Sequence, residues 1–427
     1  MTATAGATAG ATAGAADRTA YGIEALNAWC GLARITTADL FAGRGLDPAR
    51  LDNLMMTERS IGLPIEDPVT NAVNAARPLV DALPPEERDR IELVVTSTES
   101  GVDYSKSLTS YVHEHLGLNR HCRLLEVKQA CFGATAALQT AVGYLASGIS
   151  PGAKALVIAT DVAVVDEKAE YSEPAAGHGA VALLLGDDPR VLALDLGAFG
   201  NYSYETLDSA RPSPRFDIAD VDRSLFAYLD CLKHSYADYA SRVVDVDVTT
   251  DFDHLVMHTP FAGLVKAGHR KLMREHGAAP HTIDADFTRR VAPSLVYPSV
   301  VGNLCSGSVY LALASLLDSG ALTGPRRIGL FSYGSGCSSE FFSGVADERS
   351  AAAVAAQGIK AHLDHRARIT FDEYLRMLDH NLRCLEPVQH RTIDPEPWEP
   401  ILARVADRKE ILTFTGVKDY HRQYAWR

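Results

Sequence analysis

The sequence predicts an α/β protein built from two halves. Its 427 residues exceed the roughly 250 to 300 at which a single hydrophobic core stops growing. Hydrophobic side chains make up 47% of the chain and charged ones 22%, which is the balance of a folded globular protein. From Thr19 onward, short runs of β-branched residues alternate with helical segments, as in strands joined by crossover helices.

The first half contains the clearest helix start. Asp67 is a good N-cap, and Pro68 fits the first helical position because its missing N–H costs nothing there. We therefore expect a helix from this point through Leu79. The other elements expected in this half are strands over residues 91–96, 123–127 and 154–160, and helices over about 105–116 and 131–146.

The second half repeats this alternation. Its expected elements are strands over residues 255–258 and 327–331, and helices over about 261–275 and 303–317. Residues 199–223 contain Pro212 and Pro214 and are interpreted as a long irregular connection, which could equally cover an active site. Beyond Ala346 we expect an appended helical tail, with its clearest helix over residues 371–380.

These patterns divide the chain into three parts. Residues 1–18, rich in Ala, Thr and Gly, are expected to be a disordered tail. Residues 19–198 form the expected first half, and residues 199–427 form the second half with its helical tail.

Composition excludes several classes of function. The net charge of −13 argues against a generally basic nucleic-acid-binding surface. Apolar runs fall far short of the roughly 20 residues that span a bilayer. The seven cysteines form no C-x-x-C pair and the first 16 residues lack a basic start, so we expect a protein of the reducing cytoplasm, without a disulfide framework or secretory signal. Metal-ligand spacing and a phosphate-loop lysine are also missing, which predicts neither a metal nor a nucleotide cofactor.

Cys131 has the best context for a nucleophile among the seven cysteines. It follows a predicted strand and opens a predicted helix, so its sulfur would meet the positive end of the helix macrodipole, which favours the thiolate. The small residues Gly133 and Ala134 would let a substrate approach closely. The alternative is a buried core cysteine.

Glu99 lies just past the end of a predicted strand, in the crevice where open α/β sheets hold ligands. Burial there can raise the pKa of a carboxyl group, so that Glu99 could accept a carbon-bound proton at neutral pH. The alternatives are an exposed loop carboxylate and a cap for the next helix.

His258 occupies a corresponding strand-to-helix junction in the second half. An imidazole there can hydrogen-bond a carbonyl oxygen and stabilise the alkoxide that it becomes. With fifteen histidines in the chain, His254 and His269 are the nearest competitors.

Two further segments could bind substrate. Asn303 places an amide at a predicted helix start, and Ser335 lies between Gly334 and Gly336 in a turn after a strand. Such a turn can direct backbone N–H groups at an oxyanion, although a Gly-Ser-Gly sequence alone is common in surface turns.

Glu99, Cys131, His258 and Asn303, followed by the Phe-Ser-Tyr-Gly-Ser-Gly turn at residues 331–336, together resemble the 3-hydroxy-3-methylglutaryl-CoA (HMG-CoA) synthase family of the thiolase superfamily. The resemblance runs from about residue 21 to residue 344 and covers most of the chain. It implies two similar α/β halves stacked as α-β-α-β-α layers, usually in a homodimer.

Within this family the chain is most similar to the stand-alone synthases of polyketide β-branching, whose substrates are tethered to acyl carrier proteins. Residues 117–120, 127–131 and 258–261 carry this likeness. Members that use coenzyme A commonly have a lysine five residues after the catalytic histidine, where this chain has Gly263. This departure favours a carrier-protein partner.

The likeness also implies where such a partner docks. A basic cluster follows Gly263, and an acidic carrier protein would seek local positive charge on this otherwise acidic chain. The candidate docking residues are Lys266, Arg270 and Lys271, with His269 in the same cluster.

The resemblance implies a mechanism without a bound cofactor, since the substrates arrive on phosphopantetheine arms. Cys131 takes an acetyl group from a donor carrier protein, and Glu99 removes a proton from its methyl carbon. The enolate, held by backbone N–H groups such as those of Cys131 and Ser335, attacks the β-ketone of a polyketide chain on an acceptor carrier protein. His258 and Asn303 hold the ketone oxygen, and hydrolysis releases a 3-hydroxy-3-carboxymethyl acyl chain.

Other interpretations remain open. His178 stands where the family usually has only small residues and could reshape the acyl-donor pocket, while Cys305 and Ser306 replace residues that vary between branches. The alternatives for function are an HMG-CoA synthase of isoprenoid metabolism, a ketoacyl synthase III-like enzyme and a non-catalytic carrier-protein binder. Glu99 argues against the ketoacyl synthase III-like enzyme, because a decarboxylating enzyme needs no base at that position.

Overall fold

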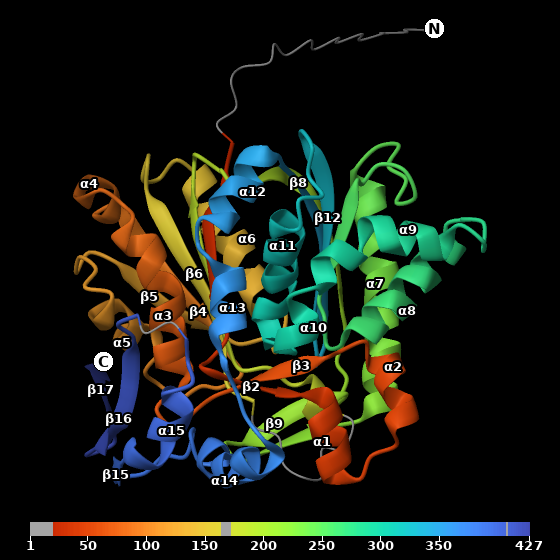
Figure 1. The fold of residues 1–427 in the computed structure, drawn as a ribbon. Coiled ribbons are helices and arrows are strands. Elements are labelled where there is room, and N and C mark those ends of the chain that lie inside the picture. The colour runs from red at the N-terminus through yellow and green to blue at the C-terminus, as the bar shows by residue number, and fades with distance from the viewer. Residues whose placement is uncertain (1–19, 164–171, 407–408) are drawn as a thin grey trace, which may run out of the picture.

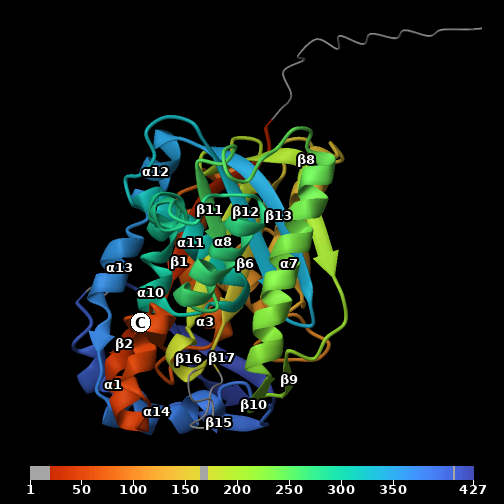
Figure 2. The same ribbon diagram turned by 90° about the vertical axis from the view of Figure 1, so that its right-hand side faces the viewer.

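The computed structural model describes residues 20–163, 172–406 and 409–427, so the tail expected over residues 1–18 lies outside the described residues. Its centre is a nine-stranded sheet in the order β11-β12-β13-β8-β1-β7-β6-β4-β5, enclosed by helices (Figures 1 and 2). Apolar residues of the central strands are almost fully buried, and they form the core on which the helices pack.

Five strands of this sheet come from the first half of the chain. From the middle of the sheet outward, the strand pairs β1–β7 and β7–β6 are antiparallel, and β6–β4 and β4–β5 are parallel. Their bounds are β1 Gly22–Trp29, β4 Ile91–Ser97, β5 Arg123–Val127, β6 Lys154–Asp161 and β7 Gly179–Gly186.

The other four strands repeat the pattern. The pairs β8–β13 and β13–β12 are antiparallel and β12–β11 is parallel, so β8, β13, β12 and β11 correspond to β1, β7, β6 and β4. Their bounds are β8 Leu192–Ser203, β11 His254–Met257, β12 Arg326–Gly334 and β13 Ser338–Ala346. The expectation of two similar halves is therefore confirmed by the topology. The expected boundary after residue 198 falls inside β8, and a division at that residue stays a prediction.

The helices complete five layers. α3 (Pro68–Asp81) packs on β1, β6 and β7, and α7 (Val221–Arg242) packs on β8, β12 and β13. Between the two parts of the sheet lie α6 (Gly133–Ala146) and α11 (Ser308–Asp318), whose apolar residues share one core cluster. The predicted α-β-α-β-α arrangement is therefore confirmed.

Local sequence signals explain the helix starts. The Asp67 carboxylate accepts the Thr70 N–H at 2.8 Å, and the Thr70 hydroxyl accepts the Asp67 N–H at 2.8 Å, so α3 begins with a capping box as its N-cap predicts. The helix expected over 303–317 begins later, because Cys305 has a φ of +49° and residues 305–307 form a 3-10 turn before α11.

Residues 199–223 are more regular than the sequence predicts. β8 extends through Ser203, a hairpin of β9 (Ser209–Ser213) and β10 (Phe216–Ala219) follows, and α7 begins at Val221. The prolines mislead because an isolated two-stranded hairpin tolerates proline where a central strand does not.

The segment beyond Ala346 is not purely helical, which corrects the expected helical tail. β14 adds to the small sheet of β2 and β3, and a separate sheet of β15, β16 and β17 closes the chain. The elements of this segment are α12 Glu348–Ala355, α13 Ile359–His365, β14 Ala367–Arg368, α14 Phe371–Leu382, β15 His390–Thr392, η5 Glu396–Trp398, α15 Glu399–Leu402, β16 Leu412–Lys418 and β17 His421–Trp426.

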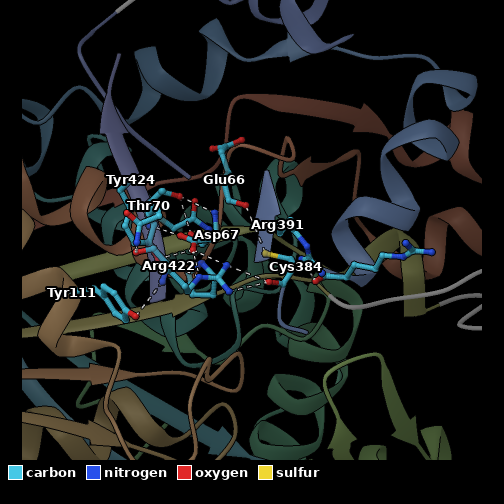
Figure 3. Close-up of polar contacts among 12 residues, drawn as sticks. Glu66, Asp67, Thr70, Tyr111, Cys384, Arg391, Arg422 and Tyr424 are labelled. Carbon is cyan, nitrogen blue, oxygen red and sulfur yellow. Dashed lines mark hydrogen bonds and ion pairs between the residues drawn. The ribbon is translucent and has the colours of Figure 1, made fainter. Parts of the chain in front are cut away.

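A buried ion pair fastens this segment to the first half (Figure 3). The Arg422 guanidinium lies 2.8 Å from Asp67 Oδ2, which also accepts the Tyr424 hydroxyl at 2.8 Å. Arg422 further donates to the carbonyl oxygen of Cys384 at 3.2 Å. Asp67 therefore caps α3 and anchors the C-terminal hairpin at once.

The remaining elements flank these layers. None of the helices in the described part of the chain is both long and apolar enough to cross a membrane. The bounds not yet given are α1 Thr37–Arg44, η1 Pro48–Arg50, α2 Leu51–Leu54, β2 Ala33–Thr36, β3 Glu58–Ile61, α4 Pro85–Arg88, α5 Thr109–His115, α8 Ala262–Glu275, α9 Ile283–Arg290, η3 Ala292–Leu295, α10 Pro298–Val301 and η4 Cys305–Gly307.

Candidate active site

Cys131 and Glu99 meet at the edge of the sheet where β4 and β5 end. The Cys131 thiol donates a hydrogen bond to Glu99 Oε1 across 3.1 Å. Glycine at residue 133 permits this approach, because a Cβ there would lie 2.3 Å from Ser97 Oγ. The start of α6 can therefore pack directly on the end of β4.

The environment of Cys131 differs from the thiolate-favouring one expected at a helix start. Contact with the Cys305 thiol lowers the pKa of Cys131, but burial and the negative charge of Glu99 outweigh it and raise that pKa to about 12. α6 begins only at Gly133, two residues later, so the helix dipole does not govern this thiol. Cys131 is therefore a protonated thiol at rest, paired with a proton acceptor.

The Glu99 backbone is held from two sides. Its N–H donates to Asp161 Oδ1 at 2.8 Å, and its carbonyl oxygen accepts from Arg211 at 3.2 Å. Asp161, at the end of β6, also accepts the Ser100 hydroxyl at 2.9 Å. Burial and the neighbouring Glu99 charge raise the pKa of Asp161.

Arg211 comes from the hairpin of β9 and β10, within the segment expected either to connect the halves or to cover an active site. Its Nη1 donates to Ser100 Oγ at 3.0 Å, and its Nε lies 2.6 Å from Asp217 in the same hairpin. Burial lowers the pKa of Arg211, but Asp217 and Glu99 more than offset this, so Arg211 stays charged. The hairpin is thus tied to the Glu99 loop.

His258 follows β11, the strand that corresponds to β4, so it occupies in the second half the place of Glu99 in the first. Its backbone N–H donates to the Phe331 carbonyl at 2.8 Å, and its own carbonyl accepts the Tyr228 hydroxyl at 2.9 Å. The side chain is buried, and burial lowers its pKa to about 3. His258 is therefore neutral at physiological pH and can offer an uncharged N–H.

Asn303 occupies the position in the second half that corresponds to the Cys131 turn, before α11 as Cys131 is before α6. Its Oδ1 accepts the Cys305 N–H at 3.0 Å and the Ser308 hydroxyl at 2.7 Å. With Oδ1 committed to these donors, Nδ2 is the group that Asn303 can offer to a substrate.

The turn at residues 334–336 joins the two halves at the site. A Cβ at Gly334 would lie 2.4 Å from the Phe132 nitrogen, so only glycine lets β12 approach the Cys131 turn so closely. The Gly336 N–H donates to Asp208 Oδ1 at 2.9 Å, so it already has a partner within the protein, and a role for Gly336 in oxyanion binding stays a prediction. The Ser335 N–H remains a predicted donor.

A second thiol lies beside Cys131. A carboxylate oxygen of Glu99 and the sulfur atoms of Cys131 and Cys305 lie within 4.8 Å of one another. All three residues are only partly buried. The hydrogen bond from Cys131, burial and nearby carboxylates raise the pKa of Cys305 above its ordinary value. In the sequence, Cys305 stands out only as a departure from the family pattern, with no indication that it lies beside Cys131.

The basic cluster on α8 is less uniform than expected. Arg270 is exposed and lies 3.5 Å from Asp284, and Lys271 lies 2.7 Å from Glu275. Lys266 sits 5.6 Å from the centre of the Phe287 ring. His269 is completely buried against Asp286 at 2.8 Å and is therefore not part of a docking surface.

His178 lies in a different environment from that of the thiol pair. Its ring contacts Asn71 at 3.0 Å and fills the space beside Gly62, where a Cβ would be 2.2 Å from the imidazole. Burial and Arg59 lower the pKa of His178 to about 3. These contacts give His178 a packing role, and an effect on the acyl-donor pocket stays a prediction.

The sequence did not single out Asp161, Arg211 or Asp208. Asp161 directly follows a predicted strand, so the rule that drew attention to Glu99 would also have selected it. Arg211 and Asp208 lie in residues 199–223, the segment predicted to be an irregular connection. The sequence there carries no sign of the contacts that the two residues make with positions more than a hundred residues away.

Comparison with known proteins agrees with this geometry. The family descriptions "Hydroxymethylglutaryl-coenzyme A synthase N terminal" and "Hydroxymethylglutaryl-coenzyme A synthase C terminal" match residues 81–190 and 278–392. The expected resemblance is therefore confirmed in both halves.

Individual relatives extend the match over nearly the whole chain. The polyketide biosynthesis 3-hydroxy-3-methylglutaryl-ACP synthase PksG of Bacillus subtilis is 43% identical, with 95% of this chain and 99% of that protein covered. The Hydroxymethylglutaryl-CoA synthase of Enterococcus faecalis is 32% identical, and the match covers 84% of this chain and 92% of the Enterococcus protein.

A solved structure agrees equally well. The HMG synthase of the curacin biosynthetic pathway, solved alone and in complex with acetyl donor-ACP, is 45% identical with a TM-score of 0.92, covering 96% of this chain and 100% of its own. With both halves matched and relatives covering almost all of its length, the chain belongs to the hydroxymethylglutaryl-CoA synthase family.

Proposed function

We propose that the protein is an HMG-acyl carrier protein synthase of polyketide β-branching. It joins an acetyl-derived carbanion to the β-ketone of a carrier-protein-bound chain and gives a 3-hydroxy-3-carboxymethyl acyl product. The observation that carries the proposal is the hydrogen-bonded pair of Cys131 and Glu99 at 3.1 Å, which combines a nucleophile with a proton acceptor.

Acyl loading is the first step. The Cys131 sulfur attacks the acetyl thioester while its proton passes to Glu99 Oε1, the atom that already accepts the hydrogen bond. Glu99 then gives this proton to the departing phosphopantetheine thiolate. The thioester moves to Cys131, and Glu99 returns to its carboxylate form.

Enolate formation uses the same carboxylate. Glu99 accepts a proton from the methyl carbon of acetyl-Cys131, and the Cys131 and Ser335 backbone N–H groups are the proposed donors to the enolate oxygen. The Glu99 N–H donates to Asp161 and the Glu99 carbonyl accepts from Arg211, and these two hydrogen bonds support this role because they fix the base relative to the thioester.

Condensation draws on the second half. The enolate carbon attacks the acceptor ketone, whose oxygen is held by His258 and by Asn303 Nδ2. The low pKa of His258 supports a role as a neutral hydrogen-bond donor that stabilises the forming alkoxide. The alkoxide takes up the proton that Glu99 removed from the methyl carbon, which restores the Glu99 carboxylate. Water then cleaves the Cys131 thioester, so the acceptor chain gains the elements of acetic acid overall.

The proposed substrates are carried by a donor and an acceptor acyl carrier protein. The names of the polyketide relative and of the curacin synthase complex support this choice over coenzyme A. Gly263, in place of a lysine common in coenzyme A-using members, agrees with it, and exposed Arg270 offers an acidic partner positive charge. We propose no resident metal or organic cofactor.

We also propose a homodimer formed through β5. This strand ends the sheet and is hydrogen-bonded only to β4 among the described strands. Its Leu125 is 48% exposed, which is unusual for an apolar residue on a free sheet edge. Pairing with β5 of a second copy would cover that edge.

The proposal is tested by incubating the enzyme with acetyl donor carrier protein and β-ketoacyl acceptor carrier protein, followed by intact mass spectrometry of the acceptor. A mass gain equal to acetic acid that requires Cys131 is expected. An unchanged acceptor mass despite acetylated Cys131 would contradict the condensation step, and retained acetylation in Cys131→Ala would contradict the assignment of the nucleophile.

A further inference from the structure

Three side chains of types that can bind a metal ion converge in the candidate active site. The carboxylate of Glu99 and the sulfur atoms of Cys131 and Cys305 lie within 4.8 Å of one another, with Cys131 and Glu99 only 3.1 Å apart. Around a zinc ion, bonds of about 2.3 Å to sulfur and about 2.0 to 2.2 Å to carboxylate oxygen keep neighbouring ligands at comparable separations.

The fold, rather than a sequence motif, assembles this group. Glu99 follows β4, Cys131 precedes α6 and Cys305 precedes α11, so the ligands come from three segments and both halves. Asn303 Oδ1 fixes the Cys305 backbone N–H at 3.0 Å, and Cys305 holds a left-handed φ of +49°. The position of the second thiol is therefore set by the backbone around it.

We propose that Glu99, Cys131 and Cys305 form a binding site for Zn²⁺ that inhibits the enzyme. Two thiolates and one carboxylate suit Zn²⁺ far better than Mg²⁺ or Ca²⁺, which require oxygen ligands. Binding replaces the two thiol protons, which leave to solvent, while Glu99 contributes its carboxylate. The ion is an inhibitor and not a resident cofactor.

The surroundings suit an open site rather than a closed structural one. All three side chains are partly exposed, so an ion can reach them and keep water in its fourth position. The nearby charge of Arg211 opposes a cation, but Asp217 lies 2.6 Å from its Nε and offsets that charge.

Zinc binding and acyl loading exclude each other, because both use the Cys131 sulfur. An acetylated Cys131 cannot supply a thiolate, and a zinc-bound Cys131 cannot attack a thioester. This exclusion rests on the proposed function, whereas the metal site itself does not.

The test uses Co²⁺ as a spectroscopic probe of the reduced, full-length protein. Tetrahedral Co²⁺ with thiolate ligands gives strong visible bands and a near-ultraviolet sulfur-to-cobalt charge-transfer band. We expect one Co²⁺ per chain with both features, displaced by Zn²⁺. Cys305→Ser should weaken binding by at least about tenfold, since even the loss of an outer partner of a metal ligand costs 10- to 100-fold.

Cys122→Ser is the matched control, because Cys122 is also a partly buried thiol but lies elsewhere, with its sulfur donating to the Ile91 carbonyl. Its spectrum should equal that of the unchanged protein. Weak bands without charge transfer, or equal binding by Cys305→Ser and the unchanged protein, would overturn the proposal. Cys131→Ser gives a second measurement if Cys305→Ser fails to fold. Because the readout is spectral, a failure here leaves the proposed synthase activity untouched.

Discussion

The Cys131 thiol donates a hydrogen bond to Glu99 Oε1 across 3.1 Å, so the nucleophile and the base form one proton-sharing pair. Glu99 raises the pKa of Cys131, which keeps the resting thiol protonated and its carboxylate partner ready to receive that proton. Reactivity is thus tied to the geometry of this pair rather than to a free thiolate.

Glu99→Gln separates loading from condensation. Removing the negative charge should lower the pKa of Cys131, so alkylation by iodoacetamide should become faster at neutral pH. The variant should still form acetyl-Cys131, more slowly because the proton acceptor is gone, while condensation falls by about 10²- to 10⁴-fold, the usual contribution of a general base. Alkylation rates against pH and single-turnover assays check this; wild-type condensation would remove Glu99 from the mechanism.

Arg211→Met tests whether the β9–β10 hairpin positions the Glu99 loop. Its hydrogen bonds to the Glu99 carbonyl and the Ser100 hydroxyl involve a charged donor, and such bonds contribute about 1.5 to 3 kcal/mol. Condensation should fall by about 10- to 100-fold, with the rate of Cys131 alkylation changed much less. Arg223→Met, at an exposed arginine of α7, is the control. Equal activity of both variants would contradict a positioning role.

Charge reversal on α8 tests the docking residues. Replacing Arg270 and Lys271 with glutamate should raise KM for the donor carrier protein most strongly at low salt, because attraction between exposed charges is screened at high ionic strength. kcat should change little. Arg349→Glu, on an exposed arginine of α12, should leave KM unchanged. A KM that stays the same in the double variant at every salt concentration would place docking elsewhere.

Glu340 should make stability depend on pH. Burial raises the pKa of Glu340 to about 8 from an ordinary 4.5, against a smaller opposite effect of its hydrogen bond from Gln139. The folded chain therefore holds this proton between those two values while the unfolded chain does not, so stability is fully present at low pH and falls as pH rises toward 8. Glu340→Gln should flatten this slope in urea-unfolding midpoints measured from pH 5 to 9. The same slope in both proteins would contradict the shift.

Leu125→Lys tests the proposed dimer. A lysine on the β5 edge should block pairing with a second copy, because charged edge residues oppose strand addition. Light scattering should then give a monomer mass for the variant and a dimer mass for the unchanged protein. Leu196→Lys is the control, since Leu196 is 52% exposed on the interior strand β8. A monomeric unchanged protein, or a dimeric Leu125→Lys, would rule out this interface.

Elements whose signals come from neighbouring residues in the sequence could be predicted. The β-branched run after Asp89 and the Asp67-Pro68 cap depend on neighbours in sequence, and β4 and α3 lie where these signals predict. The β8 strand was missed because its residues are mostly half-buried or exposed, so it shows no continuous apolar run.

The site residues also divide into those that local sequence signals predict and those that depend on contacts between distant segments. Glu99, Cys131, His258 and Asn303 each follow or precede an element that the sequence indicates, and the family resemblance supplied their grouping. Arg211 and Asp208 could not be found this way, because their roles arise from contacts between distant segments. The protonation of Cys131 also required the structure, because burial and the position of Glu99 raise its pKa, opposite to the effect expected at a helix start.

The most direct test of the proposed synthase is acetyl transfer from two donors. The enzyme is mixed with acetyl donor carrier protein or, separately, with acetyl-CoA, and its intact mass is followed, with Cys131→Ala as the control. Rapid acetylation from the carrier protein, much slower acetylation from acetyl-CoA and none in Cys131→Ala are the predicted results. Faster loading from acetyl-CoA would contradict the carrier-protein assignment and favour an HMG-CoA synthase of isoprenoid metabolism.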